Sequence, residues 1–407
     1  MLKNRIVLFA LLNLFCFIQC QKEIGIKPYY IEQLPPKWVN NEVNIYNLST
    51  QINGDINFYL AYVQNRKENN VTVQLRTINS NKLIWDWKDS RINSLELHAF
   101  SAYFLENSIV LFGTNDIFCL NKQSGSILWE KRNIKPYNFN FIKSNLLCIT
   151  IVDTSLNKNT IDHIEIFDVN NSSQLSDISI PYPDSIESNI ITHKKVLNVI
   201  HYNNSEGDFI SAVYATLQDR VTVKAYQGSY SLKTESWIYS KALLNGGDGR
   251  SEYQQFSFPE LSEIIINTGE HLLFLDEANG SVKTEYNFEI KPHYLKTFQI
   301  ENSIYAFVPG SGLYNIDIIS RSKNWHLSIV DYISQMLFFE NRIFFVDQFY
   351  KRLWNVDHNT GTIYWLLVPY KYCCFDRMLC ISRPDKEKNP FIIASSTNGL
   401  QAFEFTD

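Results

Sequence analysis

The sequence predicts an all-β protein: a single eight-bladed β-propeller of four-stranded antiparallel blades, whose ring is closed by an N-terminal strand. Three observations support this fold: a recurring strand–turn–strand pattern, a matching series of buried strands, and an aromatic-rich composition. The pattern is clearest in Asp116 to Arg132, where an alternating strand leads into Ser124-Gly125 and a second apolar strand follows.

The recurring pattern occupies nine positions: a polar residue, two variable residues, Ser or Thr, Gly or a substitute, three variable residues and Trp. Four copies keep the final Trp: Thr77–Trp85, Asn121–Trp129, Asp317–Trp325 and Asp357–Trp365. Asp276–Thr284 and Asp168–Ser176 keep the turn without the Trp, and the segment ending at Trp237 keeps the Trp with an altered turn. Adjacent regular copies lie 40 to 47 residues apart, a period typical of propellers.

The residues that recur in these turns have a structural explanation that requires no cofactor. Asp or Asn at the first position can bond the turn amides, and Gly at the fifth position permits a positive φ. A Trp in the outer strand can bury a large face between successive blades. On this basis the blade-turn structural residues are Trp85, Gly125, Trp129, Gly280, Trp325, Gly361 and Trp365.

The strand inventory agrees with eight blades. The predicted buried strands are Phe58 to Val63, Ile109 to Gly113, Leu146 to Val152, Phe209 to Thr216, Ile264 to Thr268, Ile304 to Val308, Ile343 to Asp347 and Phe391 to Ser396. Each is followed by an alternating strand, but an outer strand follows only seven of the eight turns. We therefore expect Ile24 to Ile31 to supply the missing strand, with Val43 to Ser49 as the innermost strand of the first blade.

The amino terminus resembles a signal peptide, which predicts export. Lys3 and Arg5 precede an uncharged run from Ile6 to Ile18 that is too short to span a bilayer. Residues 1–20 are thus assigned to the signal and 21–407 to the propeller. Phe17-Ile18-Gln19-Cys20 resembles a bacterial lipobox, so Cys20 is a candidate for lipidation. Gln19 departs from this motif, because a small residue is usual at its position. The alternative is a secretory signal that is cleaved near Cys20 without attachment of a lipid.

Composition and charge exclude several classes of protein. Hydrophobic residues make up 45% and aromatic residues 14% of the chain, which is enough for a large core. The net charge is -5 and the Lys and Arg residues are scattered, so nucleic acid is not an expected partner. The Cys and His residues lack metal-ligand spacing, and Asn245 to Arg250 lacks the residues of a phosphate or calcium loop. No catalytic residue or metal site is indicated.

The turns resemble the repeats of the pyrroloquinoline-quinone (PQQ) family of eight-bladed propellers over essentially the whole mature chain. That family includes quinoprotein alcohol dehydrogenases, the non-enzymatic lipoprotein BamB of outer-membrane assembly, and the lumenal propeller of the eukaryotic ER membrane complex. The resemblance to the dehydrogenases implies PQQ, calcium and a vicinal disulfide, for which Cys373 and Cys374 are candidates. Here the pair comes late in the chain, and no stretch matches the calcium ligands or the catalytic base.

The expected function is therefore binding rather than catalysis. We expect an exported, membrane-associated and monomeric propeller that has no cofactor and acts as a scaffold for a protein or a glycan. A BamB-like role in envelope assembly is one form of this function. The expected location is the outer membrane, facing the periplasm or the cell surface. A PQQ-dependent dehydrogenase and a lumenal subunit of a eukaryotic ER membrane complex, in the ER lumen or secreted, are the alternatives.

Overall fold

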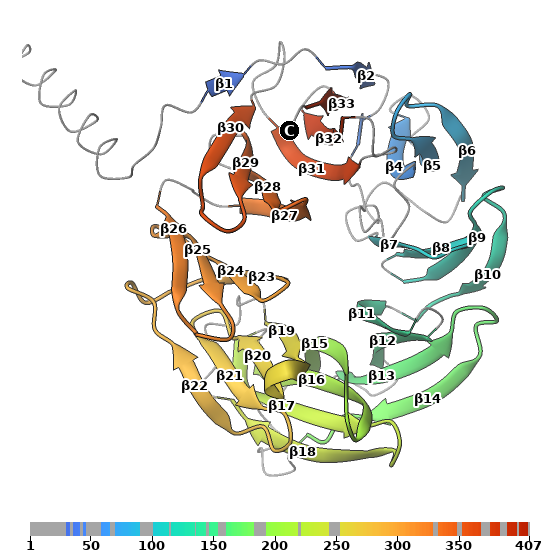
Figure 1. Ribbon diagram of the computed structural model, residues 1–407. Helices are drawn as coiled ribbons and strands as arrows, with labels where there is room; N and C mark the ends of the chain where they lie inside the picture. Colours follow the sequence, from blue (N-terminus) through green and yellow to red (C-terminus); the bar gives the residue numbers. More distant parts are fainter. Residues whose placement is uncertain are drawn as a thin grey trace, which may run out of the picture.

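The computed structural model arranges the chain as a ring of β-sheets (Figure 1). The residues that it describes are 30–32, 36–40, 44–45, 58–65, 70–89, 101–113, 115–134, 136–143, 146–153, 160–182, 193–218, 221–243, 253–328, 333–347, 352–367, 375–382, 389–396 and 399–405. Within these ranges the elements are strands apart from one short 3₁₀ helix, η2 (Pro259–Leu261). The same ranges contain no helix with the length and apolarity needed to cross a membrane.

The described residues form seven hydrogen-bonded sheets, which we number in chain order. Sheet 1 contains β3 (Asn44–Ile45), β4 (Phe58–Asn65), β5 (Asn70–Thr77) and β6 (Leu83–Lys88), and sheet 2 contains β7 (Ser101–Phe104), β8 (Ser108–Phe112), β9 (Ile117–Asn121) and β10 (Ile127–Lys131). Sheet 3 contains β11 (Pro136–Lys143), β12 (Leu146–Asp153), β13 (Thr160–Asp168), β14 (Gln174–Ser179), β15 (His193–Asn204), β16 (Gly207–Gln218), β17 (Val221–Ser231) and β18 (Ser236–Ala242).

The remaining sheets complete the circle. Sheet 4 contains β19 (Gln254–Phe258), β20 (Glu263–Asn267), β21 (Leu272–Asp276) and β22 (Val282–Tyr286), and sheet 5 contains β23 (Lys296–Ile300), β24 (Ser303–Val308), β25 (Gly312–Asp317) and β26 (Lys323–Leu327). Sheet 6 contains β27 (Ile333–Phe339), β28 (Arg342–Asp347), β29 (Leu353–Asp357), β30 (Ile363–Leu367) and β1 (Tyr30–Glu32), and sheet 7 contains β31 (Phe375–Ser382), β32 (Phe391–Ser396), β33 (Gly399–Glu404) and β2 (Trp38–Asn40).

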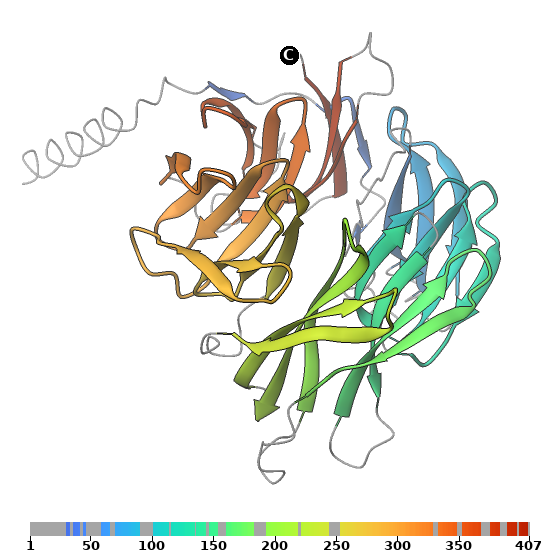
Figure 2. The same ribbon diagram turned by 60° about the horizontal axis from the view of Figure 1, so that its bottom comes forward.

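The prediction of eight four-stranded blades is wrong, because the propeller has seven sheets and two of them exceed four strands. In sheet 3, β13 and β15 pair in parallel through Thr160 with His193 and Ile161 with Lys194, which joins β11–β14 and β15–β18 into one eight-stranded sheet. The long strands of this sheet are green to yellow in Figure 2. β15 and β16 have 12 residues each, against 5 for β20 and β21, so β15 is long enough to reach the end of β13.

An N-terminal strand completes the last sheet, but it is not the predicted Ile24 to Ile31. β2 pairs in antiparallel fashion with β33, and Lys37 supports it by donating its backbone N–H to Ala402 and its ammonium to Glu404, both within 2.9 Å. β1 instead adds to sheet 6, parallel to β30. Residues 24–29 lie outside the described residues. The strand that pairs with β33 therefore lies later in the chain than the predicted strand Ile24 to Ile31.

The core lies between neighbouring sheets. Leu60 of sheet 1 packs in one cluster with Leu111 of sheet 2, and Phe274 of sheet 4 packs with Ile316 of sheet 5. The second strand of a sheet is the most deeply buried: β20 and β24 are buried along their whole length. The eight predicted buried strands overlap β4, β8, β12, β16, β20, β24, β28 and β32, and two of these, β12 and β16, belong to the single sheet 3. They could be predicted because a strand covered on both faces is apolar along most of its length.

Candidate functional site

The nine-residue turns share one backbone geometry. The residue at the fifth position has a left-handed φ in all six regular copies: 54° at Asn81, 69° at Gly125, 62° at Ser172, 68° at Gly280, 55° at Arg321 and 70° at Gly361. The first residue holds the turn with its side chain. Asn121 Oδ1 accepts the backbone N–H groups of Gln123 and Ser124 at 3.0 Å, and Asp357 Oδ1 does the same for its own turn.

The ninth-position Trp residues connect one sheet to the turn of the next. Trp85 donates its indole N–H to the backbone oxygen of Lys122 at 2.8 Å, and its ring lies so close to Gly125 that a Cβ there would be 2.7 Å away. Trp129 donates in the same way to Val169. Both indoles thus join their own sheet to the turn of the next one.

The same connection recurs later in the ring with variations. Trp325 donates to the backbone oxygen of His358 at 2.8 Å and packs on Gly361. In the fourth turn the left-handed residue is Glu235, with a φ of 50°, so the ninth position is Tyr239 and the predicted copy ending at Trp237 was placed two residues too early. Tyr239 takes the place of a Trp against Gly280. Trp365 packs edge-on against Phe405 of sheet 7, with ring centroids 5.9 Å apart.

A β-bulge precedes each of these contacts. In the outer strands β6, β10, β14, β18, β22, β26 and β30 the pairing register shifts by one residue at the eighth position, just before the Trp or its equivalent. The extra residue has no direct partner on the adjacent strand and is turned outward. The bulge residues are, in chain order, Ile84, Leu128, Leu175, Ile238, Lys283, Asn324 and Tyr364.

Four consecutive bulge residues are exposed aliphatic side chains, which we call the rim row: Ile84, Leu128, Leu175 and Ile238. Their exposed fractions are 40%, 53%, 56% and 50%. The bulge residues of the later sheets instead form polar contacts within their own sheets. Asn324 donates to Asn315 at 3.2 Å, and the Tyr364 hydroxyl donates to Asp357 at 2.8 Å. An exposed aliphatic residue at this position is therefore not required by the repeat.

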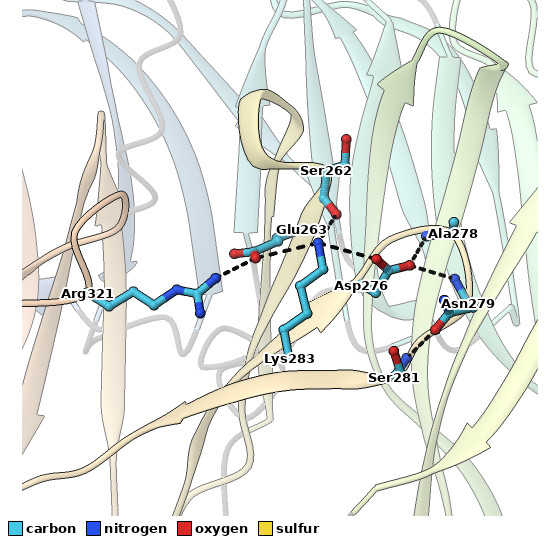
Figure 3. A network of polar contacts seen from close by, with 8 residues as sticks. All are labelled: Ser262, Glu263, Asp276, Ala278, Asn279, Ser281, Lys283 and Arg321. Carbon is cyan, nitrogen blue, oxygen red and sulfur yellow. Dashed lines mark hydrogen bonds and ion pairs between the residues drawn. The ribbon is translucent and has the colours of Figure 1, made fainter.

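Lys283, the bulge residue of β22, belongs to a network of charged side chains between sheets 4 and 5 (Figure 3). Glu263, with a side chain only 3% exposed, binds Arg321 at 2.6 Å and lies 3.6 Å from the Lys283 ammonium. Lys283 is also 3.3 Å from Asp276. Each of these two carboxylates thus lies beside a cation, and the contact between Arg321 and Glu263 joins sheet 5 to sheet 4.

Sheets 3 and 4 meet through an unusually polar interface. The buried Ser211 donates to Gln255 Oε1 at 2.6 Å and accepts from Gln227 Nε2 at 3.0 Å. Gln227 also donates to the Tyr239 hydroxyl, and Gln255 donates to Asn198. The bonds of Gln255 with Ser211 and Asn198 run from sheet 4 to sheet 3 and so join the two sheets.

The carboxyl group of Glu277 also lies at this interface. It is 4% exposed and accepts a hydrogen bond from Asn204. Burial raises the pKa of Glu277 above its ordinary value; Asp276 and Glu206 add to the rise, and the Asn204 bond and Lys283 oppose it. The surroundings of Glu277 therefore favour its protonated form over the carboxylate.

We expect Glu277→Gln to be more stable than the wild type at neutral pH. A raised folded-state pKa means that the contribution of Glu277 is fully present at low pH and is lost as the pH rises through that pKa. Gln keeps an acceptor for Asn204 without the charge. Melting temperatures from pH 4.5 to 8 should give a difference, variant minus wild type, that grows with pH. The exposed control Glu260→Gln should give a flat difference; a flat difference for Glu277→Gln as well would contradict the account.

Several predicted residues lie outside the described residues: Cys20, Cys373, Cys374 and the segment Asn245 to Arg250. Of the cysteines that are described with their side chains, Cys119 and Cys148 are buried and free, and burial raises the pKa of the Cys148 thiol to about 12. Among the described residues, no group of three or more His, Cys, Asp or Glu side chains is arranged to hold a metal ion.

Comparisons with known proteins support the fold. No protein-family model matches the chain, and no curated protein matches it in sequence. Among solved structures, BamB from Moraxella catarrhalis matches with a TM-score of 0.51 and 10% identity, over 74% of this chain and 81% of its own. Quinohemoprotein alcohol dehydrogenase from Comamonas testosteroni matches with 0.56 and 10%, over 91% and 75%. Saccharomyces cerevisiae Sqt1 matches with 0.62 and 9%, over 93% and 100%. These likenesses support a β-propeller fold.

Proposed function

We propose that the chain is an exported, non-catalytic propeller that binds another protein through the rim row. In this proposal it is held at a membrane through lipidated Cys20 or through its partner. The observation that carries the proposal is the row of exposed aliphatic side chains on four consecutive outer strands, at a position that is polar and hydrogen-bonded in sheets 4 and 5. Exposed apolar residues gathered on one part of a surface are typical of interaction sites.

A protein partner suits this surface better than a glycan. Aliphatic side chains offer no hydrogen bond to sugar hydroxyls, whereas they gain free energy by burial against other apolar side chains. The likeness to BamB is consistent with a scaffold of this kind. A role in envelope assembly is the specific form that we propose.

The test is a quantitative affinity purification from the native membrane fraction. The double variant Leu128→Ser/Leu175→Ser should reduce co-purification of the specific partner by about tenfold or more, because a buried apolar contact contributes on the order of 1 to 2 kcal/mol. The matched control is Asn324→Ser/Tyr364→Ser, at the same bulge position of other sheets. Equal recovery of all partners by the wild type and both variants would remove the rim row from the function.

A further inference from the structure

The last residue of the rim row stands directly beside the junction between sheets 3 and 4. Ile238 is followed by Tyr239, the ninth-position residue of its turn, whose ring packs on Gly280 of sheet 4. The Tyr239 hydroxyl accepts a hydrogen bond from Gln227 Nε2 at 3.1 Å, so the ring and the hydroxyl are both held at the junction. A change in the spacing of the two sheets would therefore move β18 and, with it, Ile238.

Glu277 lies in the same turn as Gly280, three residues earlier, and connects that turn to sheet 3. Its carboxyl group accepts a hydrogen bond from Asn204, the last residue of β15. Its backbone N–H donates to the oxygen of Ser262 at 3.1 Å, which ties the turn to the rest of sheet 4. The other carboxyl oxygen, Oε2, is buried and has no hydrogen-bond partner among the described residues. Ionisation would thus place a charge where little is available to stabilise it.

The charged groups around Glu277 add to this effect. Asp276 of β21 and Glu206, in the turn between β15 and β16, are carboxylates that oppose a further negative charge. Lys283 of β22 acts the other way, but its ammonium lies 3.3 Å from Asp276 and so already has a carboxylate beside it. Ionisation of Glu277 would therefore bring three carboxylates together at one junction.

Two titratable hydroxyl groups face Glu277 from sheet 3. Burial and, to a smaller extent, Glu277 raise the pKa of Tyr239 to about 12, and they raise the pKa of Tyr202 as well. Both hydroxyls are thus neutral over the range in which carboxyl groups titrate. On the side of sheet 4, Glu263 is held by Arg321 at 2.6 Å. Glu277 is therefore the buried group of this junction whose ionisation opposes the contact between the sheets.

We propose that Glu277 makes the junction between sheets 3 and 4 a pH-sensitive joint that regulates how the rim row binds its protein partner. This regulation rests on the protein-binding function proposed above. With Glu277 protonated, the bond from Asn204 and the packing of Tyr239 on Gly280 hold the sheets together. Ionisation draws water to the carboxylate, which loosens these contacts and frees β18 together with Ile238. Partner binding therefore weakens as the pH rises, and a bound partner in turn favours the protonated form.

The joint is tested by hydrogen exchange of the full chain from pH 4.5 to 8, with each rate divided by the intrinsic rate at that pH to give an opening constant. Because burial raises the pKa of Glu277 above its ordinary value of 4.5, the closed junction is fully present at the acid end and is lost as the pH rises through the raised pKa. The opening constants of the β18 amides should rise by about fivefold or more in the wild type and stay flat in Glu277→Gln. The amides of β9, in sheet 2, should stay flat in both.

Two further variants separate the titration of Glu277 from a merely structural effect. Glu206→Gln, at an exposed position, removes a neighbouring carboxylate and so lowers the pKa of Glu277, which should move the rise to lower pH. Glu260→Gln, exposed on η2 of sheet 4, is the matched control and should reproduce the wild-type curve. A flat wild-type curve, an undiminished rise in Glu277→Gln, or an equal rise at β9 would each overturn the inference.

The link to the rim row is tested by the same affinity purification at pH 5.5 and 7.5, and the probe is the protein whose recovery requires Leu128 and Leu175. The wild type should recover about fivefold more of it at pH 5.5, and Glu277→Gln should lose this difference. An equal difference in both, or none in the wild type, would overturn the link. If no protein requires Leu128 and Leu175, the proposed function fails and the exchange data alone decide on the joint. If such a protein exists but the β18 curve is flat, the joint fails and the function stands.

Discussion

Gly312→Ala is expected to lower the free energy of unfolding by about 3 to 5 kcal/mol, from backbone strain and overpacking together. Gly312, the first residue of β25, has a φ of 112°, where a side chain is strained. An added Cβ would also lie 2.1 Å from the backbone oxygen of Leu327 and 2.8 Å from Ser328 Cα. Because both neighbours are backbone atoms, no rotamer change can relieve the overlap. Urea denaturation followed by Trp fluorescence gives the measurement.

Gly310→Ala is the matched control for this prediction. Gly310 also has a positive φ, 76°, but a Cβ there meets nothing within 4 Å. We expect a loss of only about 1 kcal/mol, the cost of the left-handed backbone by itself. Equal losses for the two variants would mean that the contact with Leu327 has no energetic consequence.

The second large effect is expected at the contact between sheets 5 and 6. Trp325 is 8% exposed and donates a hydrogen bond to His358, so Trp325→Ala should cost about 3 to 5 kcal/mol. Gly361→Ala should cost about 2 to 3 kcal/mol, because its Cβ would lie 2.8 Å from the Trp325 ring and its φ is 70°. In the Trp325→Ala background the ring is absent, and Gly361→Ala should then cost only about 1 kcal/mol.

The double-mutant cycle measures this coupling directly. A coupling energy of about 1 kcal/mol or more between residues 325 and 361 is expected, whereas Gly310→Ala should add to Trp325→Ala with no coupling. Additive losses at 325 and 361 would contradict the view that the Trp ring and the turn form one packing unit. The same cycle applies to Trp85 and Gly125, where the contact is 2.7 Å.

The turns were accessible to sequence reasoning because their interactions are local. The carbonyl and side chain of Asn121 both bond amides within four residues, so the required residue types recur in the chain at fixed spacing. The positive φ at Asn81, Ser172 and Arg321 shows that the turn keeps its geometry without glycine. A weaker sequence signal at the fifth position therefore does not mean a different turn.

The rim row was missed although its signal is present in the sequence. The residue before each Trp or its equivalent is aliphatic in four consecutive copies, at Ile84, Leu128, Leu175 and Ile238. Alternation alone could not reveal the exposure of these side chains, because a bulge breaks the alternation at that residue. The register of the paired strands was needed to see it.

The sequence by itself determined the all-β propeller, its turns and its buried second strands, since each depends on residues close together in the chain. Only the tertiary structure decided the number of sheets, the closing strand and the outward direction of the rim row. Thr160 of β13 pairs with His193 of β15, and β2 pairs with β33 from the opposite end of the chain. Such contacts follow from which strand edges meet in space, and backbone pairing leaves little trace in the side chains that a sequence records.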